Sequence, residues 1–222
     1  MILYLDASAL VKRYVAEPGS AQVLTKIADA RAVGTVAISR AEVAAALAKA
    51  VRFGLLTSEV AQSAHQAFRQ DWPDFVRLPV TEPLLERAAT LVWDLGLRGY
   101  DAVQLAAGLS WQEALEAPVS FATFDRHLWA ASGRAGLIPF PNDLPALLDS
   151  WKRGEEPTAL PPPAPLQTPQ HRRRVEPGGA AGGEVTGEEG HRGEDAGHGQ
   201  EGERIGGADA EEEAGEETGE GE

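Results

Sequence analysis

Short apolar runs alternate with longer amphipathic stretches along the first 150 residues of the chain. The short runs, several of them rich in Val or Ile, indicate buried strands at residues 2–5, 32–38, 75–80, 119–124 and 137–140. The longer stretches have helical spacing and predict helices at residues 8–15, 20–30, 40–53, 58–72, 82–95, 102–115 and 126–132. This alternation predicts a three-layer α/β/α sandwich around a central, mostly parallel sheet of five strands.

Composition changes sharply near residue 150, and this change decides the domain count. Residues up to Trp151 are rich in Leu, Val, Ala and Ile, whereas the rest of the chain is dominated by Pro, Gly, Glu and Arg. We therefore predict one globular domain over 1–150, a stiff Pro-rich linker over 151–170 and a disordered acidic tail over 171–222. The favoured interpretation of the tail is a solvated segment without a specific role; the alternative is that it shields a basic site or attracts a basic partner.

The formal charge of −14 belongs mostly to that tail. Residues 1–151 hold 16 acidic and 13 basic residues (net −3), and residues 152–222 hold 18 acidic and 7 basic residues (net −11). A near-neutral domain lacks the general basic surface that nucleic-acid binding usually requires. If the domain binds nucleic acid, local basic residues or metal ions must therefore offset its carboxylates.

The chain contains no Cys, which excludes disulfides, thiolate zinc sites and a Cys nucleophile. This usage suits a reducing compartment. The N-terminus has no basic region ahead of its short apolar run, and no apolar stretch approaches about 18 residues. We expect a soluble cytoplasmic protein that does not enter a membrane.

Four acidic residues occupy suggestive positions: Asp6 in YLDASAL, Glu42 in SRAEVAAAL, Asp101 in RGYDAVQLA and Asp125 in ATFDRHLWAAS. Each has a structural explanation, because an Asp often caps the helix that follows it. Ser39 and Glu42 also fit a capping box, in which the Glu reaches back to the first amide of the helix. Taken one at a time, the capping explanation is favoured for each of the four.

The argument for a catalytic or metal-binding role is that these four positions converge on one place in the predicted fold. Residues just past the carboxyl ends of parallel strands share one edge of the sheet, where such folds bind ligands. Carboxylates about 5 Å apart repel by roughly 3 kcal/mol at an effective dielectric constant of about 20, so cations or protons must stabilise a cluster. Oxygen ligands select Mg²⁺ or Mn²⁺ rather than zinc, and such ions can support in-line attack of water on a phosphodiester.

Other polar residues near these motifs are weaker candidates. The hydroxyls of Ser8 and Thr123 are placed to orient ligands or water, although an ordinary strand-end role is favoured for Thr123. His65 and His127 lack a partner motif, and we interpret both as structural. Basic side chains that could hold a nucleic-acid backbone, with simple solvation as the favoured alternative, are Lys12, Arg13, Arg98 and Arg126.

The motifs LDASALVK, SRAEVAAAL, DAVQLAA and TFDRHLWAA, in this order, resemble those of the PIN-domain nucleases, most closely the VapC-type toxins of bacterial toxin–antitoxin modules. The resemblance covers residues 1–148, and the acidic tail has no counterpart in it. It implies a Mg²⁺- or Mn²⁺-dependent endoribonuclease that forms a homodimer and is held inactive by a cognate antitoxin reaching into the acidic cleft. By position, Asp6, Glu42, Asp101 and Asp125 match the family's acidic quartet, with Asp6 and Asp101 as the most dependable metal ligands.

Two other functions compete with this interpretation. A catalytically silent PIN-like module would bind RNA or a protein partner, but it would have no reason to keep four charges together. A phosphatase with an Asp nucleophile after the first strand would need a second Asp two residues later, where this chain has Ser8. Metal-dependent RNA cleavage separates the three, because the module shows none and the phosphatase releases phosphate from monoesters.

Overall fold

A parallel sheet of five strands forms the centre of the computed structural model, which describes residues 1–153. The strand order is β3-β2-β1-β4-β5, and all four pairings are parallel. The carboxyl ends of all five strands therefore lie at one edge, as the sequence predicts. The strands are β1 (Ile2–Leu5), β2 (Ala32–Val36), β3 (Val76–Leu78), β4 (Val119–Ala122) and β5 (Ile138–Phe140).

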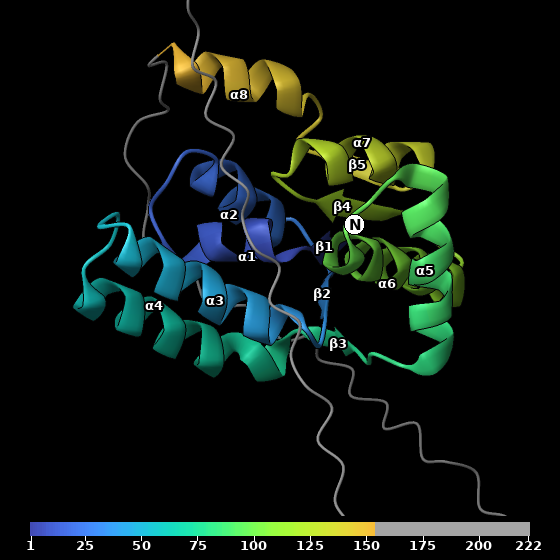
Figure 1. Cartoon of the computed structure of the whole chain (residues 1–222), viewed down its shortest axis with the longest axis horizontal. Coiled ribbons are helices and arrows are strands. Elements are labelled where there is room, and N and C mark those ends of the chain that lie inside the picture. Colours follow the sequence, from blue (N-terminus) through green and yellow to red (C-terminus); the bar gives the residue numbers. More distant parts are fainter. Residues whose placement is uncertain (154–222) are drawn as a thin grey trace, which may run out of the picture. The chain divides into compact units, whose positions relative to one another are not determined.

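Helices cover both faces of the sheet, which confirms the predicted three-layer sandwich (Figure 1). Successive residues of β1 point to opposite faces, so Tyr4 packs beneath α5, α6 and α7 while Leu3 and Leu5 pack beneath α1 to α4. The helices are α1 (Ala7–Tyr14), α2 (Ser20–Ala28), α3 (Ser39–Arg52), α4 (Ser58–Asp71), α5 (Glu82–Leu95), α6 (Gly99–Leu115), α7 (Arg126–Arg134) and α8 (Leu144–Lys152), with a 3₁₀ turn, η1 (Trp72–Asp74).

Several predicted boundaries differ from the structure, and one helix was not predicted. The strands β2, β3 and β4 end before their predicted limits, and α6 begins at Gly99 rather than at residue 102. Helix α8 is absent from the sequence prediction, although it carries a start signal. The carboxylate of Asp143 accepts a hydrogen bond from Ala146 N at 3.0 Å, and a proline occupies the first turn. The predicted linker beyond residue 153 and the predicted acidic tail lie outside the described residues.

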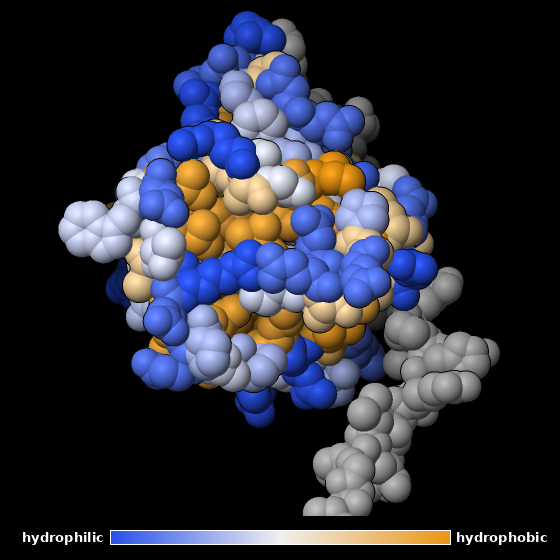
Figure 2. Space-filling model, turned by 90° about the vertical axis from the view of Figure 1, so that its right-hand side faces the viewer, coloured by the Kyte–Doolittle hydropathy of each residue, from blue (hydrophilic) through white to orange (hydrophobic). Residues whose placement is uncertain are grey.

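One outer side of the molecule, formed by α5 and α6, exposes large apolar residues. Leu85 and Leu115 are 41% and 43% exposed, and Trp93 is 88% exposed. Figure 2 shows this side, with hydrophobic surface above and below a band of hydrophilic side chains. None of the helices in residues 1–153 combines the length and apolar character needed to cross a membrane.

Candidate active site

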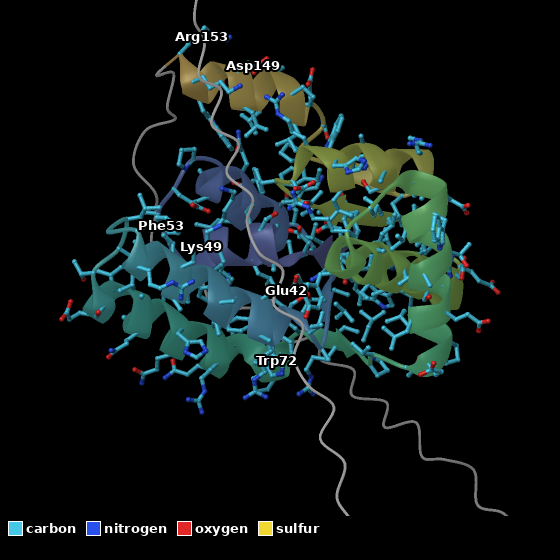
Figure 3. The ribbon with its side chains drawn as sticks, viewed as in Figure 1. Glu42, Lys49, Phe53, Trp72, Asp149 and Arg153 are labelled. Atoms are coloured by element: carbon cyan, nitrogen blue, oxygen red, sulfur yellow. The ribbon has the colours of Figure 1, made fainter. Side chains whose placement is uncertain are left out.

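The four acidic residues singled out in the sequence line a single hollow of about 670 Å³ at the carboxyl edge of the sheet. Asp6 follows β1 and Asp125 follows β4, whereas Glu42 and Asp101 lie in the first turns of α3 and α6. Figure 3 labels Glu42, which lies on the side of α3 that faces the middle of the molecule. Residues separated by more than one hundred positions in the chain are thus brought together, and we call this hollow the acidic cleft.

Asp6 is the most buried of the four, with 5% of its surface exposed. Its carboxylate accepts hydrogen bonds from Ser8 Oγ at 2.7 Å, Ala9 N at 2.9 Å and Thr123 Oγ1 at 2.8 Å. Burial nevertheless raises the pKa of Asp6 from its usual 3.8 to about 6, because desolvation of the charged form outweighs these hydrogen bonds. Asp6 therefore does cap α1, but it also places a poorly solvated carboxylate at the wall of the cleft.

Glu42 does not form the predicted capping box, because its side chain turns to α6. Its Oε2 atom accepts a hydrogen bond of 2.6 Å from Gln104 Nε2, and the same amide donates to Ser39 Oγ at 2.9 Å. The carbonyl of Gln104 accepts from the buried Tyr4 hydroxyl at 2.7 Å. Burial, followed by the nearby charge of Asp101, raises the pKa of Glu42, while the Gln104 bond lowers it. This network fixes the Glu42 carboxylate at the cleft wall.

Gln104 is a site residue that the sequence analysis missed. It is only 2% exposed and lies in α6 within an almost wholly apolar run, Ala102 to Gly108. A lone amide in such a run is a detectable signal, because a buried polar group must find partners. Here the partners are the hydroxyl of a core tyrosine and a carboxylate of the cleft.

Asp101 lies in the first turn of α6 and is not its N-cap, which corrects the capping alternative for this residue; the N-cap position belongs to Arg98. Half-burial is the largest cause that raises the pKa of Asp101, and the charge of Asp125 adds to it. The nearby side chains of Arg98 and His127 lower the pKa of Asp101. Carboxylates of the cleft therefore repel one another in the absence of a cation.

Asp125 caps α7, since its Oδ1 atom accepts from Leu128 N at 2.8 Å. Thr123 connects it to Asp6, because the threonine hydroxyl donates to Asp6 and accepts from Asp125 N at 3.1 Å. Ser8 makes a similar bridge, donating to Asp6 and accepting from Phe124 N at 2.8 Å. The two hydroxyls thus contact the first acid of the cleft and fix its orientation.

Lys12 is the one predicted basic residue that lines the cleft, and it is already engaged. Its ammonium group donates to Glu17 at 2.9 Å and to the Pro18 carbonyl at 2.7 Å. It also lies 4.3 Å from the centre of the Phe124 ring and 5.5 Å from that of Trp151, which stacks on Phe124. The otherwise unpredicted helix α8 therefore helps to hold Lys12 at the edge of the cleft.

The other three predicted basic residues do not line the cleft. The side chain of Arg13 is 3% exposed and donates to Asp71 at 2.9 Å, so it belongs to the interior of the fold. Arg126 forms an exposed ion pair with Asp149 at 3.0 Å. Arg98 lies on the surface at the start of α6, close enough to influence Asp101.

The chemistry of the cleft fits a hard divalent cation, because every acidic donor is a carboxylate and three of the four have raised pKa values. Within residues 1–153, no three His, Asp or Glu side chains are placed to ligate one ion together. Mg²⁺ does not require such a cage, since proteins typically hold it through one or two carboxylates, with water and substrate phosphates completing the shell. Asp6 and Asp101 both line the cleft, and their carboxylates are ligands of this kind.

Comparisons with known proteins agree with the motifs. The PIN domain family model matches residues 3–131, a range that contains all four acids and excludes α8. Ribonuclease VapC45 of Mycobacterium tuberculosis (strain CDC 1551 / Oshkosh) is 30% identical over 143 residues, covering 64% of this chain and 97% of that protein. Ribonuclease VapC47 of the same strain is 28% identical over 141 residues, covering 62% and 94%. The crystal structure of PAE2754 from Pyrobaculum aerophilum aligns with a TM-score of 0.39 at 21% identity, covering 69% of this chain and 98% of that one.

Proposed function

The chain belongs to the PIN-domain family, and we propose that it is a Mg²⁺- or Mn²⁺-dependent endoribonuclease, the toxin of a toxin–antitoxin module. The observation that carries the proposal is the convergence of Asp6, Glu42, Asp101 and Asp125 on one hollow. Capping accounts for Asp6 and Asp125 but not for Glu42 or Asp101, whose carboxylates make no capping bond. The similarity to ribonucleases named VapC supports RNA as the substrate.

Each residue of the cleft would have its own role in RNA hydrolysis. Asp6 and Asp101 would hold the ion, which supplies positive charge that neutralises the carboxylates and stabilises the charge developing on the phosphate. Ser8 and Thr123 keep both Asp6 oxygens in fixed directions, since each hydroxyl donates to a different one. Glu42, held by Gln104 and with a raised pKa, would orient the attacking water and accept its proton.

The test is RNA cleavage by the purified protein. Total RNA incubated with millimolar Mg²⁺ or Mn²⁺ should be cut at internal phosphodiesters, and EDTA should abolish the cutting. The Asp6→Asn variant should be inactive under the same conditions. Cleavage that persists in EDTA, or in this variant, would exclude the acidic cleft as the active site, and phosphate release from monoesters without RNA cleavage would favour the phosphatase alternative.

We also propose a homodimer with a cognate antitoxin as its protein partner, as the resemblance to VapC-type toxins implies. The exposed apolar side chains of α5 and α6, Trp93 above all, supply surface that a second copy could cover. Sedimentation at micromolar concentration should give the mass of a dimer, and a monomer would contradict this part of the proposal. For the antitoxin, the expected result is suppression of RNA cleavage when the two proteins are produced together.

A further inference from the structure

The proposed nuclease activity leaves a problem of charge. Residues 1–153 contain 16 acidic and 15 basic residues, and the cleft itself is lined by acids. An RNA backbone needs a locally positive surface to bind before any reaction. Of the four basic residues expected to provide it, Lys12, Arg13 and Arg126 are each neutralised by an acidic partner, which leaves Arg98 as the one without an ion pair in residues 1–153. Further positive surface must therefore be sought elsewhere.

A second hollow, of about 540 Å³, lies between α3 and α4. Five of its residues come from α4, with side chains three or four positions apart that share one face of the helix. None of the lining residues is acidic. The residues that line this hollow are Arg40, Gln62, His65, Gln66, Arg69 and Gln70.

Neither arginine of the hollow is neutralised by an ion pair within residues 1–153, and Arg40 is also held against an aromatic ring. The Arg40 guanidinium lies over the buried Trp72 ring, 5.9 Å from its centre, and neither Arg40 nor Arg69 forms an ion pair within residues 1–153. The acid closest to Arg69 in sequence, Asp71, accepts hydrogen bonds from Arg13 and from the Tyr14 hydroxyl. The acid closest to Arg40, Glu42, is bonded to Gln104. Figure 3 shows Trp72 at the end of α4, with nitrogen-tipped side chains projecting from the outer side of that helix.

The position of the hollow relative to the acidic cleft follows from α3, which contributes to both. Arg40 and Glu42 lie in its first turn, and two positions on a helix differ by about 200° in direction. Their side chains therefore face different sides of the same helix. A strand that passes from the cleft over the start of α3 would come to the side of that helix that carries Arg40.

We propose that this α3–α4 hollow is a phosphate-binding site for the backbone of single-stranded RNA, separate from the acidic cleft. The inference rests on the proposed function for its ligand. Guanidinium groups bind phosphate oxygens through paired hydrogen bonds, and His65 and the three glutamine amides add further donors. The hollow contributes affinity for substrates long enough to reach it and takes no part in the chemistry.

The test is the binding of a fluorescently labelled single-stranded RNA of about 20 nucleotides, which is longer than the ~4–16 nucleotides that one single-strand-binding fold covers. Anisotropy is measured in EDTA, which prevents cleavage, over a range of salt concentrations. The Arg40→Gln/Arg69→Gln variant should bind at least tenfold more weakly at low salt, and its plot of log affinity against log salt should be shallower by about 1.4, since two phosphate contacts are removed. The matched control is Arg31→Gln/Arg134→Gln, which removes the same charge from two exposed arginines without ion pairs in residues 1–153.

Two results would overturn the proposed site: an equal loss of RNA affinity in both double variants, or no loss in Arg40→Gln/Arg69→Gln. Polyglutamate that displaces the labelled RNA as well as unlabelled RNA does would also overturn it, and would point to an acidic protein as the ligand. Because Arg40 also contacts Trp72, the single Arg69→Gln variant, at an exposed position, should show part of the same loss with unchanged melting.

If RNA binds through the hollow but no metal supports cleavage, the inference stands and the proposed function fails; if RNA is cleaved and bound equally by all variants, the inference alone fails.

Discussion

Replacing Asp6 by Asn should stabilise the metal-free protein, and increasingly so as the pH rises. The folded-state pKa of Asp6 is about 6 against a usual value of 3.8, so the folded protein binds a proton that the unfolded chain has released. The stability that this proton confers is present below about pH 3.8 and is lost as the pH rises through 6. The full shift corresponds to about 3 kcal/mol, of which about 2 kcal/mol falls between pH 4.5 and 7.5.

The Asn side chain should keep most of the local hydrogen bonds. Its carbonyl can accept from Ala9 N and Ser8 Oγ, as the Asp6 carboxylate does, and its amide can donate to Thr123 Oγ1. Because Asn is about as good an N-cap as Asp, the loss of the cap itself should be small. The relief of desolvation should therefore dominate the difference between the two proteins.

The assay is urea unfolding in EDTA, followed by tryptophan fluorescence at several pH values. The difference in free energy of unfolding between Asp6→Asn and wild type should grow by about 2 kcal/mol from pH 4.5 to 7.5. The matched control is Asp143→Asn, which changes an exposed helix-capping carboxylate and relieves no desolvation. A difference for Asp6→Asn that does not change with pH would refute the idea that a desolvated charge is held at this position.

Three further changes test the fold around the cleft, each by urea unfolding. Gly108→Ala places a Cβ atom 2.8 Å from the Phe121 ring and should cost about 1 to 3 kcal/mol; an unchanged stability would mean that the ring moves freely. Arg13→Met should cost about 2 kcal/mol by removing the ion-pair partner of Asp71, which keeps only its bond from Tyr14, while RNA affinity stays the same; a selective loss of RNA affinity would show that Arg13 contacts the substrate. Trp151→Ala should cost about 1 to 2 kcal/mol by removing the ring stacked at the cleft edge, and no cost would show that α8 is not anchored there.

The layered fold and the location of the site could be predicted because both follow from local patterns. Each strand lies within a short stretch rich in apolar residues, and the parallel arrangement follows from the helices between the strands. Asp6 follows β1 directly and Asp125 lies three residues beyond the end of β4, so the strand ends place both at one edge. The same pattern that makes each of them a helix cap also brings them to the cleft.

Partners of individual side chains could not be predicted, because they depend on tertiary contacts. Ser39 and Glu42 have the spacing of a capping box, yet both turn to Gln104 on a helix more than sixty residues away. Arg13 sits beside Lys12 in the sequence, but one helical step turns it toward Asp71 in the interior. Local sequence specifies where a charge lies along an element, and only the packed neighbours decide what it contacts.

The central proposal is that the acidic cleft is a metal-dependent ribonuclease centre. Its most direct test is the single-turnover rate of RNA cleavage in Mg²⁺, measured for the Asp101→Asn variant and for the Asp94→Asn control. Asp101 lines the cleft without capping a helix, whereas Asp94 is exposed on α5, so the two variants lose the same charge in different places. The account predicts a loss of orders of magnitude for Asp101→Asn, with melting in EDTA equal to or above that of wild type, and a wild-type rate for Asp94→Asn. Cleavage by Asp101→Asn at the wild-type rate would contradict it.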